Sequence, residues 1–366
     1  MEAPIAAKIQ ADDLHLFVKT VFEHSGLSTE QATDAADVLL YASRRGVDTH
    51  GVRNLKPIYI DGFDNDHLKP YTGYKIEYET PLTARVDGGH SLGLSAACWA
   101  MRLAIQKAKD SGIGMVVMHN SRHFGAAGYY PYMALQQDMI GVGMTARVYA
   151  REQDYGVLPT FGGKSMFSTN PLSISFPTQK EPPWLLDMST STVPFNRVLM
   201  MRDAGQQIPL GWGVDADGQP TTDPNQVRFL SPLGGTREQG GHKGYGLAMM
   251  VAVLCNLLAG GWDDLYGSDP TAFDGYKVDG DSHFFAALRV DLFRPLDEFK
   301  HGMDAMIRAL HASPKAPGHD RIYVAGEIEH ETEQKRLREG VPLTPVVLGE
   351  LRELSARYHV PLKLMA

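Results

Sequence analysis

The stretch from residue 43 to 55, SRRGVDTHGVRNL, places an acid, a histidine and an arginine in one short loop bounded by glycines. Imidazole titrates near pH ~6.5, so His50 can donate or accept a proton under cellular conditions, and a neighbouring carboxylate such as Asp48 can fix its tautomer. Arg53 offers a planar pair of donors that suits a substrate carboxylate. The composition therefore allows acid/base chemistry beside a carboxylate anchor. A turn histidine and a surface arginine are the commoner alternatives.

The helix that comes before this loop must aim it. Apolar residues at helical spacing predict a first helix over residues 11–24, and Ser28 with Gln31 forms a capping box that opens a second helix. The second helix carries an apolar stripe of alanines and leucines and ends at Gly46, directly before the loop. We expect this rigid element to hold the loop in place while the loop itself stays free of regular backbone pairing.

From about residue 80 onward, short apolar runs predict strands separated by helices. Strands are expected at 84–87, 113–118, 140–145, 172–176, 184–187 and 284–292, and helices at 94–110, 129–138, 297–312, 328–339 and 344–358. Residues 57–74 and 202–240 have the composition of loops, and 146–170 that of a long irregular region. The run from 240 to 258 predicts a helix that is apolar on nearly all sides and therefore buried in the middle of the fold.

Composition narrows the class of protein. The 366 residues are 43% hydrophobic and 21% charged with a net charge of −8, which argues against nucleic acid as a main partner. The only cysteines, Cys98 and Cys255, support neither a disulfide framework nor a cysteine metal site, and a reducing compartment fits them best. The N-terminus lacks a signal-peptide pattern, and the longest mostly apolar run, 247–258, is shorter than the ~20 residues of a membrane span. We expect a cytoplasmic protein that makes no use of a membrane.

Common nucleotide fingerprints are missing. No expected strand is followed by G-x-G-x-x-G, and the nearest approach to a P-loop, FGGKS at 161–165, has Leu158 where the first glycine belongs. GGHKG at 240–244 opens a helix whose free backbone N–H groups, together with Lys243, could hold a phosphate. A glycine-rich turn needed for close helix packing explains the GGHKG motif equally well.

Two further positions have chemistry-bearing side chains. His123 follows His119 by four residues, but the pair straddles a strand end and a loop, so we predict no metal site there. His123 could point into the same cleft as His50 or simply pack its loop. Asp187 ends a strand before a run of hydroxyl residues, where it could bind sugar hydroxyls or cap the local turn. No serine has the nucleophile-elbow pattern, so covalent hydrolase chemistry has little support.

Taken jointly, five segments resemble the malate/L-lactate dehydrogenase-like family of NAD(P)-dependent oxidoreductases. That family includes ureidoglycolate, sulfolactate and diketogulonate dehydrogenases and piperideine-carboxylate reductases. The segments are DTHGVR at 48–53, NSRHFGAAGYY at 120–130, TNPLSISFP at 169–177, DMSTS at 187–191 and GGHKGYGLAMMV at 240–251. They follow the family's order across nearly the whole chain.

The resemblance implies an α/β (mixed α+β), non-Rossmann dinucleotide-binding fold. Its central sheet would be mixed and largely antiparallel, flanked by helices from both chain ends. Residues 1–78 with 294–366 would form a discontinuous helical domain carrying the acid/base loop, and residues 79–293 the dinucleotide-binding domain. The resemblance further implies a homodimer whose interface helps form the site, and NAD or NADP as cofactor.

Residue roles also follow from the resemblance. His50 matches the proton donor, with His123 as the alternative acid/base, and Arg53 would hold the substrate carboxylate. Asp48, beside His50, completes the candidate catalytic set. Positions matching cofactor contacts are Thr169, Asn170, Asp187, Met188, Ser189, His242, Lys243, Gly326, Glu327 and Ile328.

The sequence departs from the family pattern in two places, at 145–163 and at Pro194–Arg197. Arg147 or Arg151 in the first could meet the 2′-phosphate of NADP or could be a solvated charge. We therefore predict an oxidoreductase that transfers a hydride between nicotinamide and a 2-oxo or 2-hydroxy acid, without metal. A reductase of cyclic 2-imino acids and a non-catalytic carboxylate-binding protein are the alternatives.

Overall fold

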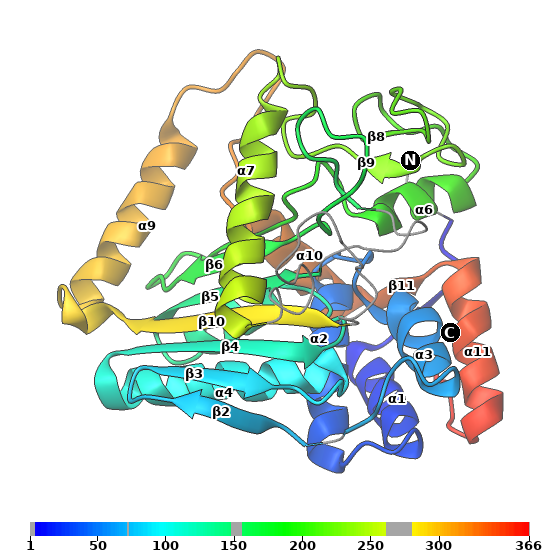
Figure 1. Cartoon of the computed structure of the whole chain (residues 1–366), viewed down its shortest axis with the longest axis horizontal. Helices are drawn as coiled ribbons and strands as arrows, with labels where there is room; N and C mark the ends of the chain where they lie inside the picture. The colour runs from blue at the N-terminus through cyan, green and yellow to red at the C-terminus, as the bar shows by residue number, and fades with distance from the viewer. Residues whose placement is uncertain (1–3, 72, 148–155, 261–279, 366) are drawn as a thin grey trace, which may run out of the picture.

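A seven-stranded mixed sheet forms the centre of the protein (Figure 1). The computed structural model describes residues 4–71, 73–147, 156–260 and 280–365. In sheet order the strands are β2 (Lys75–Glu79), β3 (Thr83–Asp87), β4 (Ile113–Ser121), β10 (Asp281–Arg289), β5 (Met139–Ala146), β6 (Leu172–Phe176) and β7 (Trp184–Met188). Within this sheet β3 and β4 run parallel, and the other neighbouring pairs run antiparallel. The predicted mixed, largely antiparallel sheet is confirmed.

Helices cover both faces of the sheet. On one face α4 (Gly93–Ser111) packs on β4 and β10, and α5 (Tyr129–Leu135) packs on β5. The other face carries α7 (Gly241–Ala252) and its π-helical continuation η3 (Val253–Leu257). Successive strand residues point to opposite faces, and accordingly Phe285 joins the main core while Phe284 packs beside Cys255.

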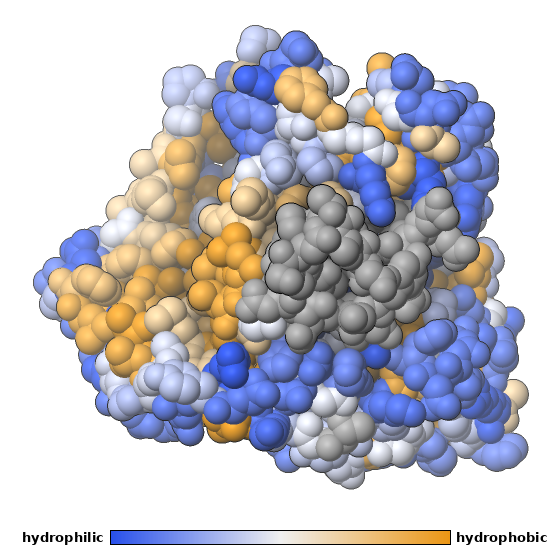
Figure 2. All heavy atoms as spheres, viewed as in Figure 1, coloured by the Kyte–Doolittle hydropathy of each residue, from blue (hydrophilic) through white to orange (hydrophobic). Residues whose placement is uncertain are grey.

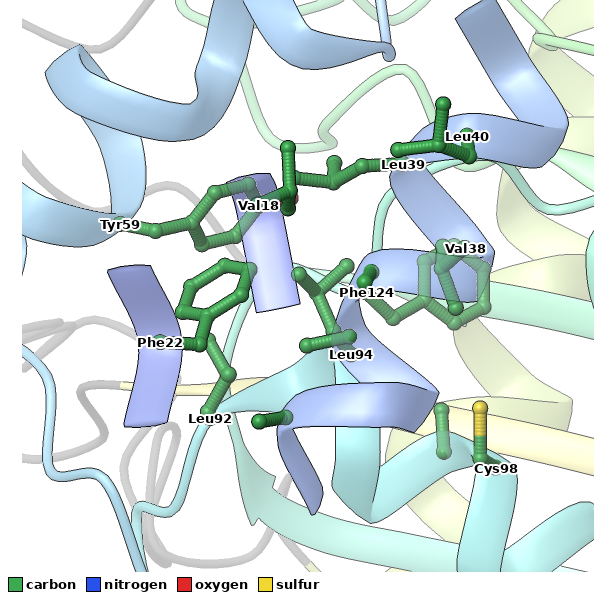
Figure 3. Close-up of a cluster of buried hydrophobic side chains, with 14 of the residues drawn as sticks. Val18, Phe22, Val38, Leu39, Leu40, Tyr59, Leu92, Leu94, Cys98 and Phe124 are labelled. Atoms are coloured by element: carbon green, nitrogen blue, oxygen red, sulfur yellow. The ribbon is translucent and has the colours of Figure 1, made fainter. Parts of the chain in front are cut away.

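The main core extends from the sheet into the N-terminal helices α1 (Ala11–His24) and α2 (Thr29–Arg44), which pack together. Side chains from these helices, such as Phe22 and Leu39, meet Tyr59 and Phe124 in Figure 3. Burying each such side chain contributes about 1.5–3 kcal/mol. The predicted capping box starts α2, because Ser28 accepts the Gln31 N–H and donates its own N–H to that side chain.

The two chain ends meet. Short strand β1 (Ala7–Ile9) pairs antiparallel with β11 (Val341–Leu343), while α10 (Glu327–Glu339) contacts α2 and α11 (Pro345–Tyr358) contacts α1. Among the C-terminal helices, α9 (Leu296–Ala312) packs instead at the β6–β7 turn. There Asp304 accepts hydrogen bonds from the backbone N–H groups of residues 179 and 180. One apolar cluster runs through both predicted domains, and the boundary at 78/79 falls inside β2, so the domain division stays a prediction.

The interpretation of 240–258 as a helix buried on all sides is wrong. Its sheet side is buried through Ala248 and Val251, but Met249 is 51% exposed and Leu258 is 53% exposed. Figure 2 shows hydrophobic residues gathered around the lower part of α7. The apolar composition therefore reflects two apolar faces, of which this chain covers one.

Other differences concern short elements in the expected loops. Residues 52–64 are helical, with η1 (Val52–Asn54), the π-helix η2 (Leu55–Ile60) and α3 (Asp61–Asp64), because Leu55, Tyr59 and Ile60 anchor them in the core. Helix α6 (Phe195–Asp203) and the short strands β8 (Gly213–Val214) and β9 (Phe229–Leu230) were not expected. The last sheet strand ends at Arg289, and the 3-10 turn η4 (Val290–Leu292) follows it. None of the helices among the described residues is long and apolar enough to span a membrane.

Candidate active site

A cavity of about 570 Å³ lies between the end of α2, the segment after β7, α6 and the start of α10. From the predicted set it gathers Asp48, His50, Thr169, Asp187, Met188, Ser189, Gly326 and Ile328. The structure thus brings the acid/base loop and much of the predicted cofactor set to one place. Arg53, His123, Asn170, His242, Lys243 and Glu327 are not part of its lining.

His50 is held by the loop that follows α2. The His50 N–H donates to Val47 O at 2.9 Å, and the Ser43 hydroxyl accepts the Val52 N–H at 3.0 Å. A side chain at Gly51 would clash with that hydroxyl, so the close return of the loop requires glycine. These contacts fix the backbone on both sides of the imidazole.

His123 lies beside His50, directly after β4. The two rings stack with centroids 5.7 Å apart and planes 15° apart. The Tyr59 hydroxyl lies 2.8 Å from His123 Nδ1, so the core residue Tyr59 fixes the second ring. Both candidates for proton transfer therefore lie side by side, with His50 in the cavity lining and His123 behind it, so the entry of His123 into the cleft stays a prediction.

Burial keeps this pair neutral. It lowers the pKa of His50 to about 3, and the nearby His123 lowers it further in the same direction. Burial also lowers the pKa of His123, against the opposing effect of Asp281. At neutral pH both rings are thus uncharged and can accept a proton.

Asp48 does not supply the predicted contact to His50. Its two oxygens bind Arg336 of α10 at 2.6 and 2.8 Å, and Arg336 also donates to Ser43 O at 2.6 Å. The hydroxyl of Thr49 lies 2.8 Å from His50 Nδ1 and takes the orienting position instead. Asp48 therefore fastens the loop to the C-terminal helix, because an arginine brought there by tertiary contact outcompetes the imidazole for it.

Arg53 points toward α6. Its Nη2 donates to Asp203 at 2.7 Å, at the last residue of that helix. At the other end of α6, Asn196 Nδ2 donates to Thr49 O at 2.7 Å and to Asn54 Oδ1 at 3.2 Å. Helix α6 is thus attached to the His50 loop at both ends.

Asp187 forms part of the opposite wall. Its Oδ2 accepts the Gly128 N–H at 2.8 Å, a contact that neither a sugar-binding aspartate nor a cap of its own turn would need. Burial raises its pKa to about 6, partly offset by the Gly128 hydrogen bond. A buried carboxyl that titrates near neutrality in a cavity wall is a common mark of a functional site.

Thr169 and Asn170 join this wall to α7. The Thr190 hydroxyl donates to the carbonyl oxygens of 169 and 170 at 3.0 and 3.1 Å. Asn170 is fully buried and donates to Ala248 O at 2.9 Å, while its Oδ1 has no hydrogen-bond partner in the described part of the chain. An unpartnered buried oxygen of this kind suits a ligand donor.

The sequence matches the family model for malate/L-lactate dehydrogenase over residues 9–352. The chain belongs to this family. It is 39% identical to the malate dehydrogenase of Pyrococcus horikoshii over 357 residues, covering 96% of each chain. It is also 34% identical to the malate/(S)-sulfolactate dehydrogenase of Methanothermus fervidus, covering 92% of this chain and 94% of that one. The predicted family and its enzyme class, an oxidoreductase, are confirmed.

A solved structure gives the same result for the fold of this family member. The crystal structure of malate dehydrogenase from Entamoeba histolytica superposes with a TM-score of 0.88 at 36% identity, covering 97% of this chain and 99% of that one. The helices and the mixed sheet described above are thus the family's fold.

The start of α7 and Glu327 lie outside the cavity lining. Lys243 is exposed, and His242 Nδ1 has no partner among the described residues. A side chain at Gly244 would clash with the Leu233 backbone, so close packing explains at least this glycine of GGHKG. Glu327 is buried and turned toward Arg321 and His311, where it accepts the Val324 N–H at 3.0 Å.

Arg147, one of the two arginines considered for a 2′-phosphate, is engaged by a carboxylate of the sheet. Arg147 binds Asp281 through Nε at 2.7 Å and Nη2 at 3.4 Å. Arg151 lies outside the described residues.

Sequence reasoning missed several lining residues. Tyr41, Arg197 and Met200 line the cavity, as does Arg45, which binds Glu333 at 2.9 Å. The position of Arg45 and Tyr41 on the last turn of the helix before the loop was the available signal. Arg197 stood out in sequence only as a departure from the family pattern.

Proposed function

We propose that this family member transfers a hydride between a nicotinamide dinucleotide and the C2 position of a 2-hydroxy acid or 2-oxo acid. The observation that carries the proposal is that His50, with His123 stacked on it, lines the same cavity as residues 187–189, Gly326 and Ile328. A general acid/base beside an enclosed cofactor wall is what hydride exchange at a carbonyl carbon needs.

His50 moves the proton in this proposal. The nicotinamide, when bound, supplies or accepts the hydride. In the direction of oxidation, neutral His50 takes the hydroxyl proton at Nε2, the nitrogen that Thr49 leaves free, and in reduction it returns that proton to the oxygen. The lowered pKa keeps His50 neutral before this step. His123 is the alternative carrier of the same proton.

Arg53 holds the C1 carboxylate in this proposal, although Asp203 already occupies one of its nitrogens. The Asp203 contact supports the assignment in one respect, because the guanidinium already donates to a carboxylate on the α6 side. Substrate and Asp203 would then compete for Arg53.

The cofactor is NAD or NADP, bound on a non-Rossmann fold. Thr169, Asn170, Asp187, Met188, Ser189, Gly326 and Ile328 would hold it. The unpartnered Asn170 Oδ1 and the buried Asp187 carboxyl fit a ligand with several donors. Lys243 and His242 would neutralise and bind its phosphates from the start of α7. Glu327 would fix the wall at 326–328 through its contacts with Arg321, His311 and the Val324 N–H.

We also propose a homodimer. Met249, Met250, Val253, Leu257 and Leu258 form a contiguous exposed stretch on α7 and η3 that soluble monomers rarely leave uncovered. Light scattering should give twice the chain mass, and Leu257→Glu should shift it toward the monomer. The two free, buried cysteines are consistent with a cytoplasmic setting.

The test is an absorbance assay at the reduced-nicotinamide band. Pure protein with NADH or NADPH is given a panel of 2-oxo acids and cyclic 2-imino acids. Consumption with 2-oxo acids supports the proposal, and the preferred nicotinamide settles the cofactor. Turnover of imines alone would make the protein an imine reductase. Cofactor binding without turnover of any compound would contradict catalysis and favour the carboxylate-binding alternative.

A further inference from the structure

Arg197 differs from Arg45, Asp48 and Asp187 in the cavity wall, whereas Glu329 in the same wall likewise makes no side-chain hydrogen bond or ion pair among the described residues. Arg45 is paired with Glu333, Asp48 with Arg336, and Asp187 accepts the Gly128 N–H. Among the described residues, the Arg197 side chain has no recorded hydrogen bond or ion pair, and it is exposed while lining the cavity. Its five N–H donors are therefore available to an anion that enters there.

The backbone of Arg197 is tied to the proton-transfer loop. It lies in the first turn of α6, next to Asn196, whose side chain binds Thr49 O and Asn54. The last residue of the helix, Asp203, binds Arg53. Both anchors of α6 thus lie within residues 49–54, on either side of His50 and not on the wall built from β7 and α10.

The attachment of α6 to residues 49–54 places Arg197 near the substrate side of the cavity. A cation whose backbone is attached beside His50 stays within reach of a substrate whose reacting carbon lies at His50. Met200, one turn further along α6, also lines the cavity and gives the guanidinium an apolar neighbour. Arg53 already accounts for one carboxylate, so a second anchor on the same loop assembly suits a second anionic group.

We propose that Arg197 binds the distal anion of a dianionic 2-hydroxy acid, a carboxylate or sulfonate at the end of the molecule opposite the C1 carboxylate. The inference rests on the proposed function and narrows its substrate class. It makes the enzyme prefer substrates such as malate over monoanionic ones such as lactate. The planar guanidinium binds a carboxylate or sulfonate through two parallel hydrogen bonds.

The test compares two substrates that share the reacting carbon and the C1 carboxylate. The kcat/KM for malate and for lactate is measured for the wild type, Arg197→Met, Arg197→Lys and the control Arg202→Met. Arg202 is an exposed cation of the same helix that does not line the cavity. Arg197→Met should lower kcat/KM for malate about 10- to 100-fold, the range for a lost charge-assisted bond, and change that for lactate less than about twofold. Lys should restore part of the loss, and Arg202→Met should match the wild type.

Two outcomes would overturn the inference. An equal loss for malate and lactate would mean that Arg197 does not read the distal group. A weaker dissociation constant for NADPH alone, with the malate-to-lactate ratio unchanged, would place a 2′-phosphate on Arg197 instead.

A binding measurement separates failure of the inference from failure of the proposed function. If the wild type turns over neither acid with either nicotinamide, the proposed function fails. Calorimetry with succinate and with butyrate, a dianion and a monoanion that cannot react, then tests Arg197 alone. Succinate binding that is lost in Arg197→Met and kept in Arg202→Met sustains the site. Equal succinate binding by the wild type and Arg197→Met would show that Arg197 does not form an anion site.

Discussion

The loop at 48–54 and the start of α7 at 240–244 look alike in sequence and differ in the structure. Each is flanked by glycine and carries a histidine followed closely by a cation, His50 with Arg53 and His242 with Lys243. The first is fastened by side chains from α2, α6 and α10 and lines the cavity. In the second, Lys243 is exposed and Gly244 lets the helix approach Leu233.

This difference shows that composition identifies candidate site residues. Contacts with residues distant in the sequence then determine which candidates are held in the cavity wall. Thr49, Asp48 and Arg53 are held by residues 147, 288 and 150 positions away in the chain. Such partners fix side chains within the narrow tolerance that catalysis needs. A solvent-exposed lysine at a helix start keeps a wider range of positions and suits the looser task of neutralising phosphate.

The largest effect should come from the first region. His50→Ala should lower kcat by ~10² to 10⁴, because a positioned acid/base contributes that much, while the dissociation constant for the nicotinamide changes little. In the direction of oxidation, activity requires neutral His50, so the acidic limb of the kcat/KM profile should lie below the ordinary histidine pKa and vanish in the variant. If His123→Ala removes that limb and His50→Ala mainly raises KM, the two roles are exchanged.

The second region is tested by Lys243→Ala. Loss of a charge-assisted phosphate contact should weaken cofactor binding by roughly 1–3 kcal/mol, about 5- to 150-fold in the dissociation constant. Fluorescence titration with NADH and NADPH measures it, with Arg237→Ala, an exposed cation six residues earlier, as control. Unchanged constants for both nicotinamides would show that the start of α7 serves packing alone.

Substitutions of Arg53 and Asp203 test whether Arg53 can exchange its ion pair with Asp203 for a substrate carboxylate. Arg53→Lys should retain less than about a tenth of kcat/KM, because a point charge does not reproduce a two-pronged contact. Asp203→Asn should lower KM by removing the competing carboxylate. Equal kcat/KM for the Arg and Lys enzymes, or a raised KM in Asp203→Asn, would make the pair a purely structural tie of α6.

The smallest effect concerns the layer beneath the histidine pair. His283 is fully buried against Phe124, and burial lowers its pKa to about 4. Since this lies below the unfolded value of ~6.5, its contribution to stability is present above that pH and is lost as pH falls toward 4. Between pH 7 and 6 the free energy of unfolding should drop by less than about 1 kcal/mol from this group. Urea unfolding at both pH values should show a smaller drop in His283→Phe, and an identical drop would contradict the assignment.

The sequence predicted much of the fold, and the reasons are local. Helices α1, α2, α4 and α11 follow from apolar spacing together with caps such as Ser28 and Thr344. Most sheet strands follow from short apolar runs. Among the elements that were missed, α6 and the π-helix η2 are short, and distant residues anchor them. Asn196 and Asp203 of α6 bind residues 49–54, and Tyr59 of η2 lies in the main core.

The candidate site was predictable in its members but not in its connections. Residue types and the family motifs identified His50, His123, Asp187 and the 187–189 segment, because imidazole and carboxylate chemistry belongs to the side chain itself. The structure alone decided that Thr49 orients His50, that Asp48 binds Arg336 and that Arg53 binds Asp203. Ion pairs form between groups that folding brings together. The sequence alone does not show which distant residue will lie beside a given charge. The exposed side of α7 could not be predicted for the same reason. Apolar composition indicates that a face must be covered, but it does not show which surface covers it.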